Sequence, residues 1–363
     1  MATNDSIRDA TREGPLNLRR LEVLARACLP PEVFAYIAGG AADERTVAEN
    51  CAAYERVALL PRVLVDVATR DAAIELLGQS MSAPWLIAPT AMHALVHRDA
   101  ELATARAAAS CGITMVCSTL STTPIEAVAR ACSDALWFQL YVYRDRGATA
   151  ELVARVQQAG VRALVVTVDA PLLGLRERDH AHGVGLPAGF RAPNVRADGD
   201  VDAAHLGDYF AALVDPSLSW RDLEWLRSIT TLPIVLKGVL RADDAGQAAA
   251  AGVAGIVVSN HGGRQLDGAI ATFDALPAVR AAVGDRVAVL VDGGIRRGTD
   301  VLKALARGAD AVQLGRPILW ALARGGERAV VAALRQLHHE FDLAMALCGC
   351  PRIDAIDASL LAR

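Results

Sequence analysis

The chain has 363 residues, of which 53% are hydrophobic and 4% aromatic, and its formal net charge is only −4. This length can form one large hydrophobic core or two smaller ones. The nearly balanced charge provides no basic field, which argues against nucleic acid as a partner. No apolar run reaches the length of a membrane span, and residues 1–12 are polar with mixed charges. We therefore expect a cytoplasmic protein that does not use a membrane as a partner.

The seven cysteines are an odd number, and none of them stands in a Cys-x-x-Cys spacing. Cys348 and Cys350, separated by one glycine, provide too few ligands for a metal site. Scattered reduced thiols are therefore expected, with neither a disulfide framework nor a metal.

In chain order, residues 16–57 predict two or three helices, and residues 60–82 predict extended segments that could cover one end of a barrel. From residue 84 onward, short apolar runs alternate with helical patterns. The eight runs are 84–89, 113–118, 136–142, 163–169, 233–237, 255–259, 287–292 and 311–314. Continuous apolar runs, as opposed to alternating ones, are typical of strands buried on both faces.

The segments between the runs have the pattern of amphipathic helices. An apolar stripe follows the third run, and Gly160 is placed to end that helix. Before the last run, Thr299 or Asp300 can cap a helix that ends at Gly308. Alternating strands and helices imply right-handed crossovers and a parallel sheet. Eight such units predict an α/β fold of the closed (β/α)₈ TIM-barrel class, with an open doubly wound sheet as the lesser alternative.

We expect a single domain over residues 1–363, with N-terminal helices and extended segments at 16–82 and the barrel at 84–350. An insertion at 176–218, between the fourth and fifth strands, is rich in Gly, Pro, Asp and Ala. A loop of this length in a compact domain is usually a lid or partly disordered. Its region 183–216 is mostly polar and does not resemble a bilayer anchor. The charged residues there are Arg191, Arg196, Asp198, Asp200, Asp202 and Asp208.

Polar side chains close every apolar run. They are Thr90, Ser118, Gln139 with Tyr141, Thr167 with Asp169, Lys237, Ser259 with His261, Asp292 and Arg316. Any one of them could be a cap or a turn residue. Because the carboxyl ends of barrel strands meet on one face, where barrel enzymes have their sites, the set predicts a large polar pocket.

The stretch from Ser259 to Asp267 follows a buried run and opens into a glycine-rich turn. It holds His261 and Arg264 three residues apart where a strand ends. An imidazole beside a guanidinium suits a substrate that loses a proton while carrying a carboxylate. A solvated surface turn is the alternative.

The residues that follow the last two predicted strands have a pattern typical of a phosphate-binding site. Asp292 is followed by Gly293, Gly294 and Arg296, and Gly315 is followed by Arg316. Glycines let backbone N–H groups approach phosphate oxygens, and arginines add positive charge. Barrels commonly bind phosphate at this position, so we expect a phosphate-bearing ligand.

Lys237 ends a buried strand and has two functional interpretations besides an ordinary ion pair. It could stabilise negative charge on a bound cofactor, or it could form a Schiff base. The residues alone thus leave open a lyase or isomerase on a phosphate-binding barrel, and a non-catalytic barrel that binds a phosphorylated ligand.

Five segments carry a resemblance to a known family: 88–92 (Ala-Pro-Thr-Ala-Met), 138–141 (Phe-Gln-Leu-Tyr), 167–169 (Thr-Val-Asp), 259–267 and 292–300. The chain resembles the FMN-dependent L-2-hydroxy acid oxidases and dehydrogenases, such as glycolate oxidase, lactate oxidase and mandelate dehydrogenase, from about residue 16 to residue 355. Residues 139–146 and 298–306 look especially like glycolate oxidase.

The resemblance implies a role for each site residue. His261 would be the catalytic base and Asp169 the carboxylate that orients it. Tyr141 would bond the substrate hydroxyl, and Lys237 would stabilise the reduced flavin. The substrate would also meet Tyr36, Leu120, Arg176 and Arg264. The remaining residues would bind FMN, and they are Pro89, Thr90, Ala91, Ser118, Gln139, Thr167, Ser259, Asp292, Gly293, Gly294, Arg296, Gly315 and Arg316.

By this resemblance the protein would oxidise an L-2-hydroxy acid to the 2-oxo acid, since no side chain can accept the electrons and FMN can. His261 would take the hydroxyl proton while hydride leaves the α-carbon, or would take the α-proton to give a carbanion. An oxidase that reduces dioxygen to hydrogen peroxide is favoured over an L-lactate or L-mandelate (hydroxymandelate) dehydrogenase with another acceptor. The resemblance also suggests homotetramers or octamers. The last residues lack a peroxisomal Ser-Lys-Leu ending.

Two positions depart from glycolate oxidase. Leu120 stands where those enzymes carry an aromatic residue, which favours L-lactate or a larger 2-hydroxy acid over glycolate. Thr119 stands where a smaller residue is more usual, and its branched side chain could narrow the access of dioxygen or substrate to the flavin.

Overall fold

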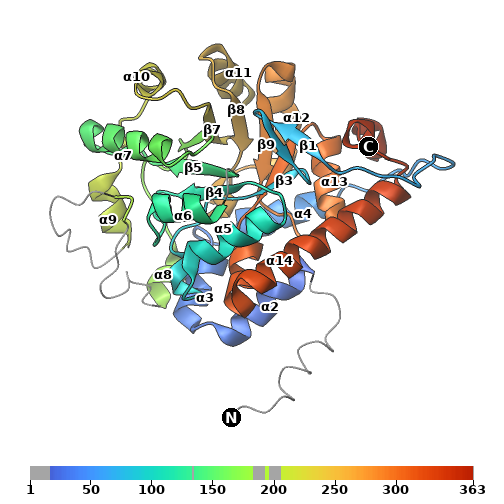
Figure 1. Ribbon diagram of the computed structural model, residues 1–363, viewed down its shortest axis with the longest axis horizontal. Helices are drawn as coiled ribbons and strands as arrows, with labels where there is room; N and C mark the ends of the chain where they lie inside the picture. Colours follow the sequence, from blue (N-terminus) through green and yellow to red (C-terminus); the bar gives the residue numbers. More distant parts are fainter. Residues whose placement is uncertain (1–16, 133–134, 183–192, 196–205, 363) are drawn as a thin grey trace, which may run out of the picture.

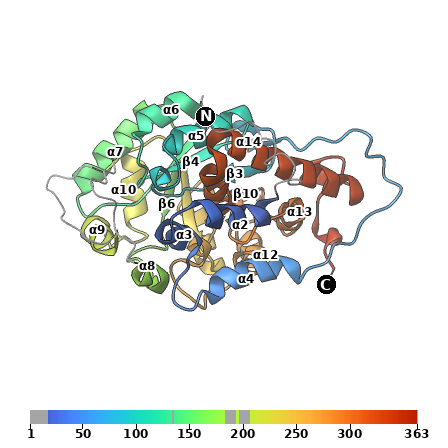
Figure 2. The ribbon, with the colours of Figure 1, turned by 90° about the horizontal axis from the view of Figure 1, so that it is seen from below.

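The computed structural model describes residues 17–132, 135–182, 193–195 and 206–362. At its centre, eight parallel strands form a closed barrel in the order β10-β3-β4-β5-β6-β7-β8-β9, and helices surround it (Figures 1 and 2). The strands are β3 (Trp85–Ile87), β4 (Met115–Ser118), β5 (Leu136–Leu140), β6 (Leu164–Thr167), β7 (Ile234–Val239), β8 (Gly255–Val258), β9 (Ala288–Asp292) and β10 (Ala311–Leu314). Closure leaves the sheet without a free edge, so the alternative of an open doubly wound sheet is wrong.

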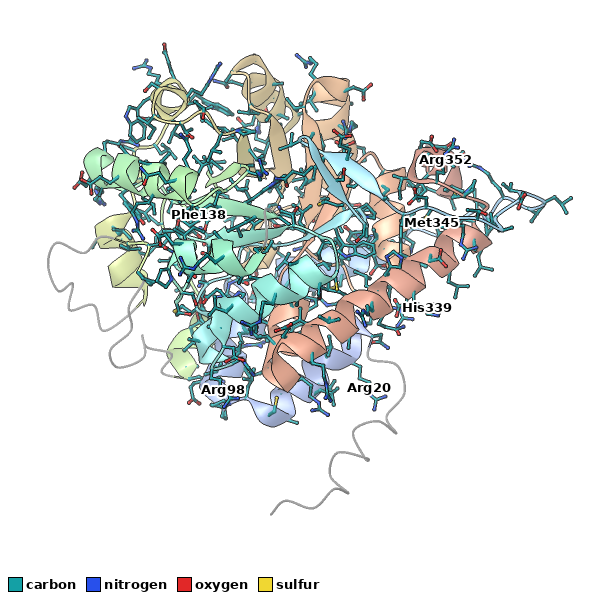
Figure 3. All side chains as sticks on the ribbon, in the orientation of Figure 1. Arg20, Arg98, Phe138, His339, Met345 and Arg352 are labelled. Atoms are coloured by element: carbon teal, nitrogen blue, oxygen red, sulfur yellow. The ribbon has the colours of Figure 1, made fainter. Side chains whose placement is uncertain are left out.

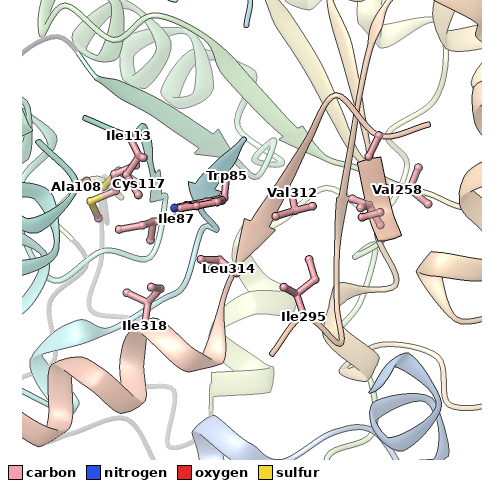
Figure 4. Packing of buried hydrophobic residues seen from close by; sticks show 14 of the residues in the cluster. Trp85, Ile87, Ala108, Ile113, Cys117, Val258, Ile295, Val312, Leu314 and Ile318 are labelled. Carbon is pink, nitrogen blue, oxygen red and sulfur yellow. The ribbon is translucent and has the colours of Figure 1, made fainter. Parts of the chain in front are cut away.

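Each of the eight apolar runs overlaps one barrel strand, which confirms the (β/α)₈ prediction. Alternate residues of each strand face opposite ways. One set, including Leu86, Val116 and Val257, fills the barrel interior. The other set packs outward against the helices, as the Trp85 ring does edge-on against His338 and Phe341 of α14. In Figure 4, Ile87 and Leu314 of this set lie closer than Trp85 and Val312 to Ile318 of α14. Both faces of the strands are therefore buried, and this explains the continuous apolar runs.

A small antiparallel hairpin closes the N-terminal end of the barrel. Its strands are β1 (Ile74–Leu76) and β2 (Gln79–Met81). Leu76 and Met81 join the interior core, and Gln79 accepts a hydrogen bond of 2.9 Å from the indole N–H of Trp137. The predicted extended segment therefore does cover one end of the barrel. The cavity of the barrel opens at the other end, where the strands terminate.

Helices form the outer layer and the N-terminal extension. Around the barrel lie α5 (Ala100–Ser110), α6 (Ile125–Cys132), α7 (Arg146–Gln158), α10 (Asp222–Ser228), α11 (Ala242–Ala250), α12 (Thr272–Val283), α13 (Gly298–Ala306) and α14 (Arg316–Leu347). The extension consists of α2 (Leu18–Cys28), α3 (Pro31–Ala38) and α4 (Arg45–Glu55). Short 3₁₀ helices are η1 (His93–Leu95), η2 (His261–Gly263), η3 (Gly284–Arg286), η4 (Ile353–Ala355) and η5 (Ala358–Leu360).

The helix ends agree with the glycine predictions but not with the predicted cap of α13. Gly160 and Gly308, just after α7 and α13, have φ of +84° and +103°. The residue that caps α13 is Arg297, not Thr299 or Asp300. Asp300 instead lies in the first turn, where its carboxylate accepts hydrogen bonds from the backbone N–H groups of Arg296 and Arg297. A carboxylate at the third helical position can reach back to the cap, which explains the error.

The insertion after β6 contributes α8 (Glu177–Ala181) and α9 (Leu206–Leu213). Arg191, Arg196, Asp198, Asp200 and Asp202 lie outside the described residues, and so does much of the predicted lid. Among the residues that the structure describes, no helix is both long enough and apolar enough to span a bilayer.

Candidate active site

A cavity of about 150 Å³ opens at the C-terminal end of the barrel strands. With two exceptions, every predicted site residue lines it. The predicted lining residues are Tyr36, Pro89, Thr90, Ala91, Ser118, Leu120, Gln139, Tyr141, Thr167, Arg176, Lys237, His261, Arg264, Asp292, Gly293, Gly294, Arg296, Gly315 and Arg316. The exceptions, Asp169 and Ser259, hydrogen-bond residues of the wall from behind.

His261 stands at the start of η2, three positions after the last residue of β8, with φ of +59°. A non-glycine residue in the left-handed region is uncommon, and functional sites are one of the places where such strain persists. The backbone N–H of His261 donates to Ser259 Oγ at 3.0 Å, which helps to fix the turn. The imidazole is 18% exposed and lines the cavity, so it is accessible to a small ligand.

The imidazole Nδ1 lies 2.9 Å from Asp169 Oδ1. An ionised carboxylate can only accept hydrogen bonds, so Nδ1 carries the proton and Nε2 keeps a free lone pair. Burial lowers the pKa of His261, and the nearby Lys237 and Arg176 lower it further, against the opposing pull of Asp169. Burial tends to raise the pKa of Asp169, but attraction to His261 and Lys237 outweighs it and the pKa is lowered. The pair is therefore a neutral imidazole oriented by a carboxylate, which is the arrangement of a general base.

A second ionic pair, Lys237 with Asp292, belongs to the lining of the cavity. Lys237 Nζ donates to Ser259 Oγ at 2.9 Å and lies 3.3 Å from Asp292 Oδ2, while the Ser259 hydroxyl donates to the same carboxylate oxygen. Burial tends to lower the pKa of Lys237, but Asp292 and Asp169 outweigh it and raise the pKa. A lysine that stays protonated is a poor amine nucleophile, which argues against the Schiff-base interpretation.

The opposite wall is built from neutral side chains. Gln139 accepts a hydrogen bond from Ser118 Oγ at 3.1 Å and donates to Thr167 Oγ1 at 3.0 Å. The three residues come from the adjacent strands β4, β5 and β6, and Ser118 and Gln139 are direct register partners. This ladder fixes which way the Gln139 amide points.

Two arginines approach one another at the mouth. Arg264 donates to the backbone carbonyls of Tyr36 and Gly39 at the end of α3, and its guanidinium lies 5.0 Å from the Tyr36 ring centre. Arg176 is only 8% exposed, and its Nε has no hydrogen-bond partner. Burial and repulsion from Arg264 lower the pKa of Arg176 to about 10. An anion bound between the two would relieve this repulsion and supply acceptors, so the mouth suits a carboxylate.

The loops after β9 and β10 provide a second positive region. Gly293 and Gly294 have φ of +89° and +83°, and a Cβ on Gly294 would lie 1.9 Å from the Asn50 carbonyl oxygen of α4. Arg296 lies 5.0 Å from the Trp320 ring, and Arg316 donates to three backbone carbonyls. Burial and repulsion from Arg264 and Arg296 lower the pKa of Arg316 to about 9. A bare glycine backbone beside uncompensated cations suits a phosphate group.

Several lining residues were not predicted as site residues. They include Ile37, Phe210 and Gln313. Phe210 comes from α9 of the insertion and packs edge-on against Tyr141 at 4.9 Å. Gln313 lies inside β10, and neither polar atom of its amide has a partner. No local pattern marks Phe210, whereas a glutamine inside an apolar strand could have been noticed.

The expectation for Thr119 is wrong. Thr119 is fully buried and does not line the cavity. Its hydroxyl donates to the Gln139 carbonyl at 2.7 Å and accepts from the backbone N–H of Tyr141. Because it points away from the cavity, it supports β5 and does not narrow the access path.

Comparisons with known proteins point to one family. The profile of the FMN-dependent dehydrogenase family matches residues 25–363. An L-lactate oxidase from a Nostoc species is 50% identical over 357 residues, which cover 96% of this chain and 98% of the relative. The human 2-hydroxyacid oxidase 1 is 47% identical over 346 residues, with 93% and 94% covered.

Solved structures agree with the sequence relatives. The structure of a mandelate oxidase with (S)-4-hydroxymandelic acid superimposes with a TM-score of 0.91 at 42% identity, covering 95% of this chain and 98% of that one. The same enzyme with benzoyl-formic acid gives a TM-score of 0.88, with 96% and 98% covered.

Proposed function

Because the chain belongs to the FMN-dependent dehydrogenase family, we propose that it oxidises an L-2-hydroxy acid to the 2-oxo acid with FMN as cofactor and dioxygen as the final acceptor. The observation that carries the proposal is the His261–Asp169 pair beside two arginines and a phosphate-type glycine loop. A base, a carboxylate site and a phosphate site are the three parts that such a reaction requires.

The residues at the cavity fit FMN. The amide of Gln313 and Oδ1 of Asp292 are buried without partners, although buried polar atoms are almost always hydrogen-bonded. A polar cofactor with both donors and acceptors would satisfy them. The glycine loop and the arginine cluster described above fit its phosphate.

We assign the cofactor contacts accordingly. Arg296, Arg316 and the backbone at Gly293, Gly294 and Gly315 would hold the phosphate. The neutral wall would hold the flavin ring through Pro89, Thr90, Ala91, Ser118, Gln139 and Thr167. When bound, FMN accepts two electrons from the substrate and passes them to dioxygen, which gives hydrogen peroxide.

The chain's own residues would bind the acid and move its proton. Arg264 and Arg176 would hold the substrate carboxylate, with Tyr36 beside them, and Tyr141 would bond the hydroxyl. Nε2 of His261 would then accept the hydroxyl proton, and Asp169 would stabilise the imidazolium formed. Lys237, kept protonated by Asp292, would supply a fixed positive charge that stabilises the negative charge of the reduced flavin.

We propose L-lactate or a larger 2-hydroxy acid as the preferred substrate over glycolate. Leu120, Leu173 and Phe210 line the cavity with apolar surface that an acid without a side chain could not fill. The similarity to an L-lactate oxidase and to mandelate oxidases supports the same choice.

Replacing Leu120 tests this choice. Leu120→Trp should fill the apolar space and raise the ratio of kcat/KM for glycolate to that for L-lactate by roughly tenfold, since one or two buried methylenes change discrimination by about 1–3 kcal/mol. The flavin absorbance of the variant controls for cofactor loss. An unchanged ratio would contradict the assignment of Leu120.

The function itself is tested by the absorption spectrum of the purified protein. The spectrum is recorded anaerobically with glycolate, L-lactate or L-mandelate, and again after air is admitted. A yellow protein that one acid bleaches and air recolours supports the oxidase. Bleaching without recovery would indicate a dehydrogenase with another acceptor, and a protein that cannot be loaded with FMN would overturn the proposal.

We also propose that the protein assembles into homotetramers or pairs of tetramers. Exposed apolar side chains gather in two places: Leu60, Val63, Leu64 and Val65 with Leu343 and Leu347, and Val168, Leu172, Leu175, Leu266 and Ile270. In the first group, Leu60, Val63, Leu64 and Val65 lie on an arm, residues 58–72. Leu343 and Leu347 lie at the end of α14, beside this arm and near Met345 and Arg352 (Figure 3). Two different patches can pair head to tail between copies and close a ring.

Light scattering tests the assembly. Leu64→Asp should release monomers with unchanged circular dichroism, because Leu64 is fully exposed and makes no core contact. A wild-type monomer would contradict the proposal. A cytoplasmic location stays a prediction that cell fractionation can check.

A further inference from the structure

A buried polar cluster lies behind Thr90, on the side away from the cavity, and the mechanism above does not use it. Its members are His93 in η1 and Glu101 and Thr104 in α5, each no more than 1% exposed. Polar groups buried this deeply are costly unless they are hydrogen-bonded. The cluster therefore calls for a specific explanation.

The His93 ring lies between two threonine hydroxyls. Its Nε2 is 2.7 Å from Thr90 Oγ1, and its Nδ1 is 3.1 Å from Thr104 Oγ1. Thr90 lines the cavity, whereas Thr104 lies within the fold. The ring thus links a residue of the site to a residue outside it.

The backbone around the ring is held firmly. Glu101 accepts a hydrogen bond of 3.1 Å from the backbone N–H of His93. The same carboxylate accepts from the backbone N–H and hydroxyl of Thr122 and from the hydroxyl of Thr123. With these donors satisfied, the carboxylate does not bond the imidazole, whose side-chain hydrogen-bond partners are the two hydroxyls.

Burial lowers the pKa of His93, against the attraction of Glu101. A neutral imidazole has one N–H donor and one lone-pair acceptor. A hydroxyl can be a donor or an acceptor. Two arrangements of the protons therefore give both nitrogens of the His93 ring a hydrogen bond to a hydroxyl.

In one arrangement Thr104 donates to Nδ1, Nε2 donates to Thr90, and the Thr90 proton is free to point into the cavity. In the other, Nδ1 donates to Thr104 and the Thr90 proton points at Nε2, which leaves only lone pairs facing the cavity. The tautomer of His93 thereby decides whether Thr90 offers a donor or an acceptor.

We propose that His93 is a positioning residue whose tautomer sets the hydrogen-bonding polarity of Thr90 and follows the redox state of the cofactor. The proposal rests on the proposed function in one respect, that a flavin occupies the cavity. Two-electron reduction of a flavin ring adds an N–H donor where the oxidised ring has only an acceptor. A hydroxyl beside the ring can match both forms only if its own proton can be redirected, and His93 provides that freedom.

The direct test is nitrogen NMR of the holoenzyme with ¹⁵N-labelled histidine, oxidised and then reduced with dithionite. The His93 signals are assigned by their loss in His93→Gln. On reduction, these signals should show that the proton has moved from one ring nitrogen to the other, between Nδ1 and Nε2. The same tautomer in both states would overturn the proposal. A wild-type protein that holds no flavin would instead contradict the proposed function, so the two failures are distinguishable.

A variant outside the cavity gives an independent readout. Thr104→Val removes the partner of Nδ1, so the proton should stay on Nε2, because an orphaned buried N–H is rarer than an orphaned acceptor. The Thr90 hydroxyl would then always donate toward the cavity. Because the oxidised ring offers an acceptor there and the reduced ring an N–H, this would stabilise the oxidised cofactor. We expect a more negative midpoint potential, a single tautomer in both states and an unchanged KM for the hydroxy acid.

The matched control is Thr114→Val. Thr114 is equally buried but lies just before β4, at the opposite end of the barrel, where its hydroxyl donates only a long hydrogen bond of 3.4 Å to Gln79. This variant should keep the wild-type potential. A Thr104→Val potential equal to that of the control would also overturn the proposal.

Discussion

The wall of the cavity that β7 to β10 provide carries paired charges, whereas the wall from β3 to β6 is neutral. On the first wall, Lys237 is paired with Asp292, and His261 with Asp169 of the neighbouring β6 loop. On the second, hydroxyls and an amide, such as those of Ser118 and Gln139, bond one another. Lys237 and Asp292 are 4% and 7% exposed, close to the 5% and 2% of Ser118 and Gln139, so exposure to water does not explain the difference between these pairs.

The difference follows from what each wall has to do. A buried ion pair holds a fixed charge in place, which suits proton transfer and the stabilisation of developing charge. A hydroxyl or amide can be donor or acceptor, which suits a neutral ring with both kinds of atom. Breaking a buried ion pair also costs more than breaking a neutral hydrogen bond, so substitutions on the two walls should differ in size.

The largest effect is expected at the catalytic base. His261→Gln should lower kcat by about 10²–10⁴-fold, the usual contribution of general-base catalysis. Because Gln keeps the polarity of the site, FMN should stay bound with an unchanged visible spectrum. Loss of the flavin together with the activity would show that His261 has a structural role instead.

The charged wall should be sensitive to loss of one partner. Lys237→Met leaves Asp292 buried and unpaired, and the free energy of unfolding should fall by about 3–5 kcal/mol. Urea unfolding of the flavin-free protein measures this without a contribution from cofactor affinity. The double variant Lys237→Met with Asp292→Asn should recover most of the loss, and a failure to do so would argue against a strong ionic coupling.

Loss of one hydrogen-bonding partner in the neutral wall should lower the free energy of unfolding less than loss of Lys237 does. Gln139→Leu removes the partner of Thr167 and one partner of Ser118, so the loss should be about 1–3 kcal/mol. The same urea experiment applies. If Gln139→Leu destabilises the protein more than Lys237→Met does, the contrast between the two walls is wrong.

The smallest expected effect is the dependence of kcat/KM on pH. The base must be neutral, and the pKa of His261 lies below its ordinary value of about 6.5. The rate constant kcat/KM should therefore be level above about pH 6.5 and fall tenfold per pH unit once the pH drops below that pKa. An acid limb already present at pH 8 would mean that another group is titrating.

The fold could be predicted from the sequence because each of its eight strands has the same physical requirement. A strand buried on both faces needs an unbroken apolar run, and all eight runs overlap strands of the barrel. The strand ends carried the polar residues of the site for a related reason, since carboxyl ends of parallel strands meet on one face. The error at α13 arose because Asp300 can reach the cap from inside the helix.

Only part of the candidate active site could be predicted from the sequence patterns alone. The roles of Tyr36 and Arg176 came from the family resemblance, because neither stands at a strand end. Phe210 was missed because it comes from the insertion, far from the strand ends in sequence. Thr119 was misjudged because its neighbour Leu120 does line the cavity, and adjacent side chains can face opposite ways.

The sequence by itself determined the barrel, the residues at its mouth and the family, since these depend on local patterns and motifs. Only the tertiary structure decided which polar atoms meet. The pairing of His261 with Asp169 joins residues 92 positions apart, and the Thr90–His93–Thr104 chain depends on how η1 packs against α5. Hydrogen bonds require distances correct to a few tenths of an ångström, and such distances are set by the packing of the whole barrel and not by any local stretch of chain.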